Sequence, residues 1–145
     1  MTVDRSFIEL NNASRERMRK LAEGLTDEQM QTKVGEHWTV SIVYVHLAWW
    51  ERRTLVVLDM TEKAGKLTYP ELDVVINDIS LPLWEVIPPR DAVRIALESA
   101  EAVDKRLETY PETLLEEVHN QYRRWVFRAD HRNEHLGEAE TALKK

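Results

Sequence analysis

Three histidines are the residues of this sequence best suited to do chemistry together. His131 and His135 lie four positions apart, so on a helix their imidazole rings project side by side and can bind one metal ion. Such a pair arises by chance on many exposed helices, and two ligands do not make a site. His46 is the best candidate for a third ligand, because it falls on the apolar side of a predicted helix and points inward.

His46 also has a plainer interpretation. A lone histidine on an apolar helix face is more often a hydrogen-bonded core residue than a metal ligand. The ligand interpretation gains weight because the pair on the last predicted helix needs a third partner. On that helix the apolar stripe and the histidine pair lie about 100° apart, at the ideal turn per residue. We therefore expect a solvent-open groove beside the core, which suits a catalytic metal with a vacant position.

The composition limits which metal ligands and which partners the chain can have. The chain has 145 residues and no cysteine, which excludes disulfides and thiolate clusters and leaves nitrogen and oxygen as metal ligands. A net charge of −6 makes nucleic acid an unexpected partner. The first twenty residues are too polar for a signal peptide, and no later apolar run is long enough to cross a bilayer. We expect a soluble cytoplasmic protein with no membrane partner.

One basic cluster departs from the acidic balance. Four arginines fall within ten residues near the C-terminus: Arg123, Arg124, Arg128 and Arg132. The first interpretation is a solvated helix face paired with nearby acidic side chains, namely Glu116, Glu117, Asp130 and Glu134. The second is a clamp for an anionic small molecule, since guanidinium groups bind anions well.

Helix-breaking residues divide the chain into four predicted helices. Glycine and proline are scarce and leave four long stretches without strong breakers, apart from a glycine in the last stretch. The expected helices run from about Asp4 to Gly24, from Thr39 or Ser41 to Gly65, from Pro88 and Pro89 to Pro111, and from about Asn120 to the C-terminus. The fold class is therefore all-α, and residues 1–145 form one expected domain.

The segment between the second and third predicted helices is unusually long. From about Lys66 to Pro89 it carries prolines and no sustained helical period. A connection of this length predicts a crossover, so these two helices should lie roughly parallel rather than form a hairpin.

The order of three short motifs resembles a known family. Trp-Thr-Val at 38–40 leads into a helix with His-Leu-Ala-Trp-Trp-Glu at 46–51, and a C-terminal helix carries His-Arg-Asn-Glu-His at 131–135. This pattern resembles the DinB/YfiT-like superfamily, which includes mycothiol-dependent maleylpyruvate isomerases. The resemblance covers nearly the whole chain, including the long connection.

The resemblance implies both a fold and a site. The fold would be a four-helix bundle of up-down-down-up topology, often a homodimer. The site would hold a divalent metal such as nickel or zinc on His46, His131 and His135, and related members use the metal to bind a low-molecular-weight thiol. No substrate signature accompanies the motifs. Arg128 and Trp50 are our candidate substrate-binding residues, and Glu134 is a weaker candidate for supporting the metal ligands.

Two hypotheses follow. The leading one is a metal-dependent enzyme, a small-thiol-dependent S-transferase, isomerase or hydrolase, in which a metal ion promotes loss of a proton from a thiol or water. The alternative is a non-catalytic helical-bundle binding or stress-response protein.

Overall fold

Four long helices make up most of the chain. The computed structural model describes residues 2–145, and these helices are α1 (Phe7–Glu23), α2 (Val40–Ala64), α4 (Pro89–Glu108) and α6 (Ala129–Leu143). The only sheet in the described part is a small antiparallel hairpin of β1 (Lys33–Val34) and β2 (Trp38–Thr39). The predicted all-α class is confirmed.

Local sequence signals set the ends of the two central helices. Thr39 caps α2 by accepting a hydrogen bond on its side chain from the backbone N–H of Ile42, at 3.2 Å. The same helix ends at Gly65, whose φ of 73° lies in the left-handed region that glycine adopts without strain. Pro89 opens α4, where its missing N–H leaves no helical hydrogen bond unmade. Both helices therefore begin close to their predicted positions.

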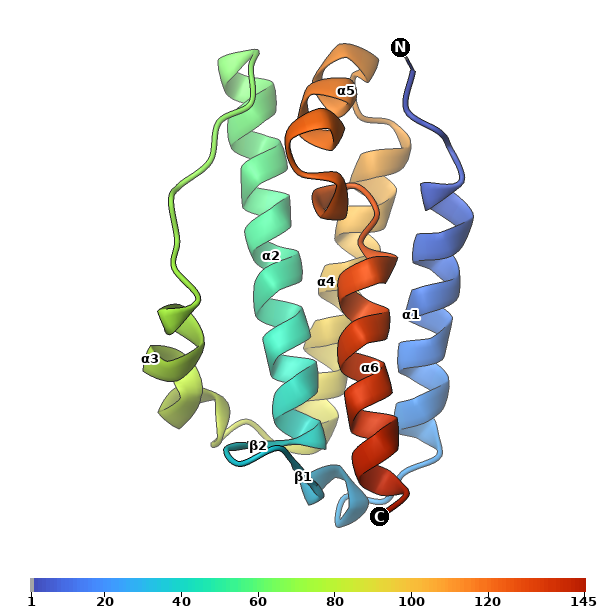
Figure 1. Cartoon of the computed structure of the whole chain (residues 1–145), viewed down its shortest axis with the longest axis vertical. Helices are drawn as coiled ribbons and strands as arrows, with labels where there is room; N and C mark the ends of the chain where they lie inside the picture. The colour runs from blue at the N-terminus through green and yellow to red at the C-terminus, as the bar shows by residue number, and fades with distance from the viewer. Residues whose placement is uncertain (1) are drawn as a thin grey trace.

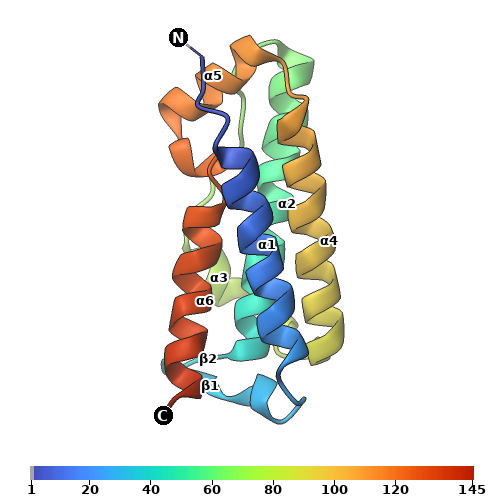
Figure 2. The ribbon, with the colours of Figure 1, turned by 90° about the vertical axis from the view of Figure 1, so that its right-hand side faces the viewer.

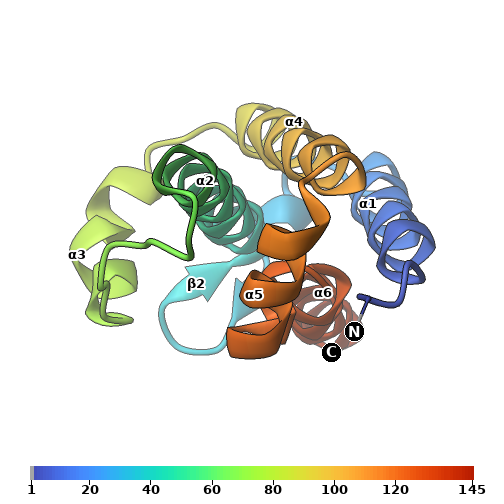
Figure 3. The same ribbon diagram turned by 90° about the horizontal axis from the view of Figure 1, so that it is seen from above.

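The four helices surround one shared interior. In Figure 1 the chain descends along α1, rises along α2 and again along α4, and descends along α6. The most extensive packing is between α2 and α4, while α1 packs against α4 and α6, as Figure 2 shows from the side. The view from above in Figure 3 places α3 (Val75–Trp84) outside this group, beside α2. The hairpin closes the lower end of the bundle.

The connection between α2 and α4 differs from expectation. It contains α3, ten residues long, although Pro82 lies inside it. The Asp73 side chain accepts a hydrogen bond from the backbone N–H of Val75 at 2.9 Å and so supports the start of the helix. Several apolar side chains of α3 face solvent, so the sequence shows no core-facing stripe there, and the prediction of a segment without helical order was wrong.

The last predicted helix is interrupted. It was expected from about Asn120, but that residue lies at the end of a separate helix, α5 (Glu112–Gln121); a short 3₁₀ turn at Arg123–Trp125 follows, and α6 begins only at Ala129. Asn11 of α1 stabilises the non-helical backbone before α6. Its amide nitrogen donates to the carbonyl of Val126 at 2.8 Å, and its side-chain oxygen accepts from the N–H of Ala129 at 2.9 Å. This contact spans more than a hundred residues, so no local pattern could reveal it.

The interior has two apolar clusters with an ionic layer between them. One cluster centres on the first half of α2 and includes Tyr44 and Leu47. The other lies toward the opposite end and includes Phe7 and Leu58. Glu51 falls between the two clusters along α2 and is completely buried.

Candidate metal centre

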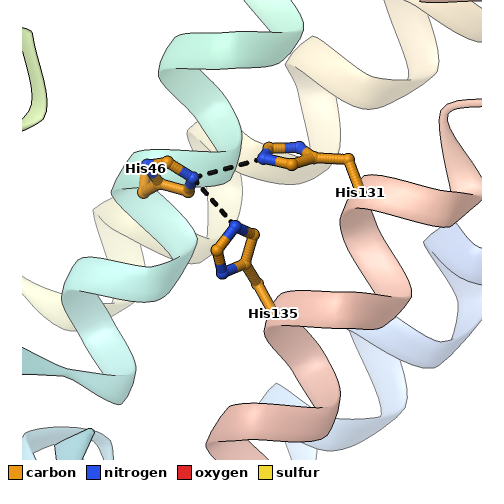
Figure 4. A group of neighbouring side chains, drawn as sticks. All are labelled: His46, His131 and His135. Carbon is orange, nitrogen blue, oxygen red and sulfur yellow. Dashed lines mark hydrogen bonds between the residues drawn. The ribbon is translucent and has the colours of Figure 1, made fainter. Parts of the chain in front are cut away.

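The three predicted ligands converge on one point. His46 lies on α2, and His131 and His135 lie on adjacent turns of α6. The Nε2 atom of His46 is 3.2 Å from Nε2 of His131 and 3.1 Å from Nε2 of His135 (Figure 4). Metal–nitrogen bonds of 2.0–2.1 Å place ligand nitrogens about 2.9 to 3.4 Å apart. The ligand atoms of all three histidines lie within 4.8 Å of one another, so the donor set fits a divalent ion.

Burial keeps two of the histidines neutral. The side chain of His46 is only 4% exposed, and His131 is half-buried. Burial, reinforced by the neighbouring His135, lowers the pKa of His46 to about 3. Burial and the positive charge of Arg128 lower the pKa of His131 to about 2. At neutral pH both imidazoles are therefore uncharged, the state in which histidine binds metals.

Asn77 of α3 orients His46. The Oδ1 atom of Asn77 lies 3.2 Å from Nδ1 of His46 and also accepts a hydrogen bond from the indole N–H of Trp50 at 3.0 Å. With this oxygen as acceptor, His46 carries its proton on Nδ1, and the lone pair of Nε2 faces the other two histidines. Sequence reasoning missed Asn77, because it lies in the segment that was expected to lack a helix.

The other two histidines have different partners at Nδ1. The carboxylate of Glu138 lies 2.6 Å from Nδ1 of His135 and favours a proton there, which leaves Nε2 available as a ligand. Arg128 instead donates from Nη2 to Nδ1 of His131 at 3.3 Å, which places the proton of His131 on Nε2, facing His46. For His131 to bind a metal through Nε2, this proton must move to Nδ1 and the contact with Arg128 must lengthen.

Tryptophans shield the cluster from one side. The Trp38 ring centroid lies 4.6 Å from that of His46 and 5.9 Å from that of His135, and Trp84 of α3 lies 6.0 Å from His46. The hairpin and α3 therefore cover the site with aromatic surface, while the side chain of His135 keeps 17% of its area exposed.

The arginine cluster divides into two kinds of residue. Arg123 pairs with Asp130, and Arg124 pairs with Glu134 at 2.8 Å, as the solvated-face interpretation expects. That interpretation was wrong for Arg128 and Arg132, which are both buried. Their charges need internal partners.

Glu51 is the main partner of both buried arginines. Its carboxylate accepts from Arg128 at 2.9 and 3.1 Å and from Arg132 at 2.8 and 3.0 Å. Arg132 also donates two hydrogen bonds to Asp104 of α4, both 2.9 Å long. The ionic layer thus ties α2, α4 and α6 together directly beside the histidines. Glu134 contacts Arg124 on the surface, and no hydrogen bond of the described residues joins it to the histidines.

The two predicted substrate-binding residues lie on one cavity. Trp50 and Arg128 both line a hollow of about 160 Å³ whose wall also includes His131. Their role in binding a substrate stays a prediction.

Comparison with known proteins agrees with this geometry. The sequence model of the DinB superfamily matches residues 11–139. The chain belongs to the DinB superfamily. No curated protein and no solved structure gives a significant match to this DinB-superfamily chain. Within residues 2–145, no helix combines the length and the apolar character needed to traverse a membrane.

Proposed function

We propose that this member of the DinB superfamily is a cytoplasmic metal-dependent enzyme that holds nickel or zinc on His46, His131 and His135. The observation that supports the proposal most directly is the convergence of three Nε2 atoms at spacings that suit a single ion. Three imidazoles leave coordination positions open, as catalytic sites require.

The proposed reaction class is transfer, isomerisation or hydrolysis that depends on a small thiol. A divalent ion supplies one property when it is bound: it lowers the pKa of a thiol or water among its ligands, so that a nucleophile forms near neutral pH. The protein's own residues do the rest. Asn77 and Glu138 orient two of the ligands, Trp38 and Trp84 keep water away, and Trp50 and Arg128 face the cavity in which a substrate would lie.

Metal analysis tests the ligand set. Protein purified without an affinity tag should carry about one metal ion per chain, and the His46→Ala variant should lose most of it, because two ligands bind far more weakly than three. His37→Ala is the matched control, since His37 is exposed. Equal metal content in wild type and His46→Ala would remove His46 from the site.

A panel of small thiols with electrophilic and ester substrates tests the activity. The expected result is turnover that depends on metal and is lost in His46→Ala. A fully metal-loaded protein without turnover on any member of the panel would favour the non-catalytic alternative.

We also propose that the chain forms a homodimer through α3. Apolar side chains line this helix and face solvent: Val75, Ile79, Leu83 and, just after its end, Val86. A contiguous apolar face on an outer helix is typical of a protein–protein interface.

A further inference from the structure

One half-buried arginine beside the metal centre has no hydrogen-bond partner among residues 2–145. Arg53 lies on α2, seven residues after His46, so both side chains fall on the same side of the helix. Its Nε atom is buried and makes no hydrogen bond. Arg128 and Arg132 are fully buried, and both bind the Glu51 carboxylate. A buried N–H group without an acceptor is costly, so Arg53 requires an explanation.

The surroundings of Arg53 offer no negative charge. Its guanidinium carbon lies 4.3 Å from the Trp125 ring centroid and 5.6 Å from that of Trp50, so aromatic rings hold it in place. Burial and the neighbouring positive charge of Arg128 lower the pKa of Arg53. Within residues 2–145 no carboxylate forms an ion pair with it. The positive charge at this position therefore has no countercharge within the described part of the chain.

Arg53 faces the same cavity as His131. The hollow of about 160 Å³ is lined by Arg53, Thr54 and Trp125 together with Trp50, Arg128 and His131. A water molecule takes about 30 Å³ in the liquid, so the hollow has the volume of about five waters. This is enough for a charged group and a few carbon atoms of a substrate whose remainder extends outward.

Arg128 has few donors left for a ligand. Its Nε and Nη2 atoms bind Glu51, and Nη1 donates to the backbone carbonyl of Arg124. Within residues 2–145, neither Nη group of Arg53 donates a hydrogen bond, so Arg53 is the guanidinium that can offer a free pair of N–H groups to the cavity.

We propose that the cavity between Trp50 and Trp125 is a subsite for the carboxylate group of a small organic acid, and that Arg53 is the residue that recognises it. The planar guanidinium matches a carboxylate through two parallel hydrogen bonds. One free guanidinium matches a monoanion better than a phosphate dianion. The inference rests on the proposed function, since it places the carboxylate of the substrate next to the ligand His131.

Tryptophan indole resonances of ¹⁵N-labelled, metal-free protein provide the test. Acetate, the simplest carboxylate, should shift the Trp50 and Trp125 indole signals saturably, whereas neutral acetamide should not. Each signal is assigned with the corresponding Trp→Phe variant. Arg53→Gln should weaken acetate binding at least tenfold, since charge-assisted bidentate pairing is lost. Arg53→Lys keeps the positive charge but lacks the two parallel N–H donors. Its affinity for acetate should therefore lie between those of the wild type and Arg53→Gln.

Arg52→Gln is the matched control. Arg52 is adjacent in sequence but exposed, so the variant should bind acetate as the wild type does. Metal content as purified is measured on a separate sample of each variant and should be unchanged in Arg53→Gln. Loss of acetate binding by the metal-free variant, with a wild-type metal content in the purified variant, assigns the effect to the subsite, not to the metal centre or to unfolding.

Three results would overturn the proposal: equal shifts with acetate and acetamide, unchanged acetate affinity in Arg53→Gln, or tighter binding of inorganic phosphate than of acetate. If acetate binds as expected while untagged wild-type protein carries no metal, the subsite is supported and the proposed enzymatic function fails.

Discussion

The three proposed metal ligands depend on residues that form hydrogen bonds with their second ring nitrogens. His46 points its Nε2 lone pair at the other histidines while Asn77 accepts a hydrogen bond from its Nδ1–H group. Groups of this kind fix the tautomer and ring orientation of a ligand, and their loss commonly weakens metal binding by 10- to 100-fold. Asn77 is therefore expected to support metal binding, although it lies on the outer helix α3.

Asn77→Ala should weaken metal affinity by about 10- to 100-fold without removing the metal site. The cause is the loss of the acceptor for His46, together with the loss of the Trp50 contact. Competition with a chromophoric chelator measures the affinity. Asn120→Ala, at an exposed position, should leave it unchanged. Equal affinities of wild type and Asn77→Ala would show that Asn77 does not orient the ligand.

Buried neutral histidines also make the metal-free protein sensitive to acid. The pKa of His46 is about 3 in the folded chain, against about 6.5 in an unfolded one. Below pH 6.5 the unfolded state therefore binds a proton that the folded state does not. The stability of the folded state then falls as the pH falls, down to about pH 3.

Between pH 7 and pH 5 this effect should cost the metal-free protein about 2 kcal/mol through His46 alone. His46→Gln, which cannot take up the proton, should lose correspondingly less stability over the same range. Urea unfolding at several pH values measures the difference. Parallel pH profiles for the two proteins would contradict a lowered pKa of His46.

At the scale of elements, the buried ionic layer fixes how the helices meet. Glu51 of α2 binds two arginines from the α6 region, and Arg132 continues to Asp104 of α4. Arg15 of α1 reaches the same Asp104 at 2.6 Å. All four long helices are thus joined at one level, next to the turn that carries His131.

Glu51→Gln should destabilise the fold by about 3 to 5 kcal/mol, because it leaves two arginines buried without their shared countercharge. Equilibrium urea unfolding measures the loss. Glu98→Gln, which disrupts only a solvent-exposed pair with Arg94, should cost less than about 1 kcal/mol. Similar costs for the two variants would mean that the ionic layer does not stabilise the bundle.

Sequence reasoning found those elements and residues whose signals are local. Thr39, Gly65 and Pro89 mark helix ends by their own chemistry, and the histidine spacing predicts one shared helix face. Sequence reasoning failed where contacts between residues far apart in the chain determine the structure. Asn11, near the N-terminus, binds the backbone of Val126 and Ala129 and so sets where α6 begins. The pairing of Arg132 with Glu51 likewise becomes evident only when the helices are packed.

At the scale of the whole molecule, α3 links an exposed apolar surface to the proposed metal centre. Ile79 and Leu83 of α3 are 67% and 70% exposed, and Val86 just after it is 77% exposed, while Asn77 and Trp84 of α3 contact His46. In Figure 3, α3 lies on the opposite side of the bundle from α1. A partner that covers the apolar face would also hold Asn77 in position.

Leu83→Glu and Ile79→Glu should therefore convert the proposed homodimer into a monomer, because each places a charge in an apolar interface. Sedimentation equilibrium measures the mass. Leu10→Glu is the matched control, since Leu10 is 49% exposed on the far side of the bundle, and this variant should stay dimeric. Because α3 carries Asn77, the monomeric variants should also bind metal more weakly than the control. A wild-type chain that is monomeric at all concentrations would show that α3 keeps Asn77 in place without a partner and that its apolar face is not a homodimer interface.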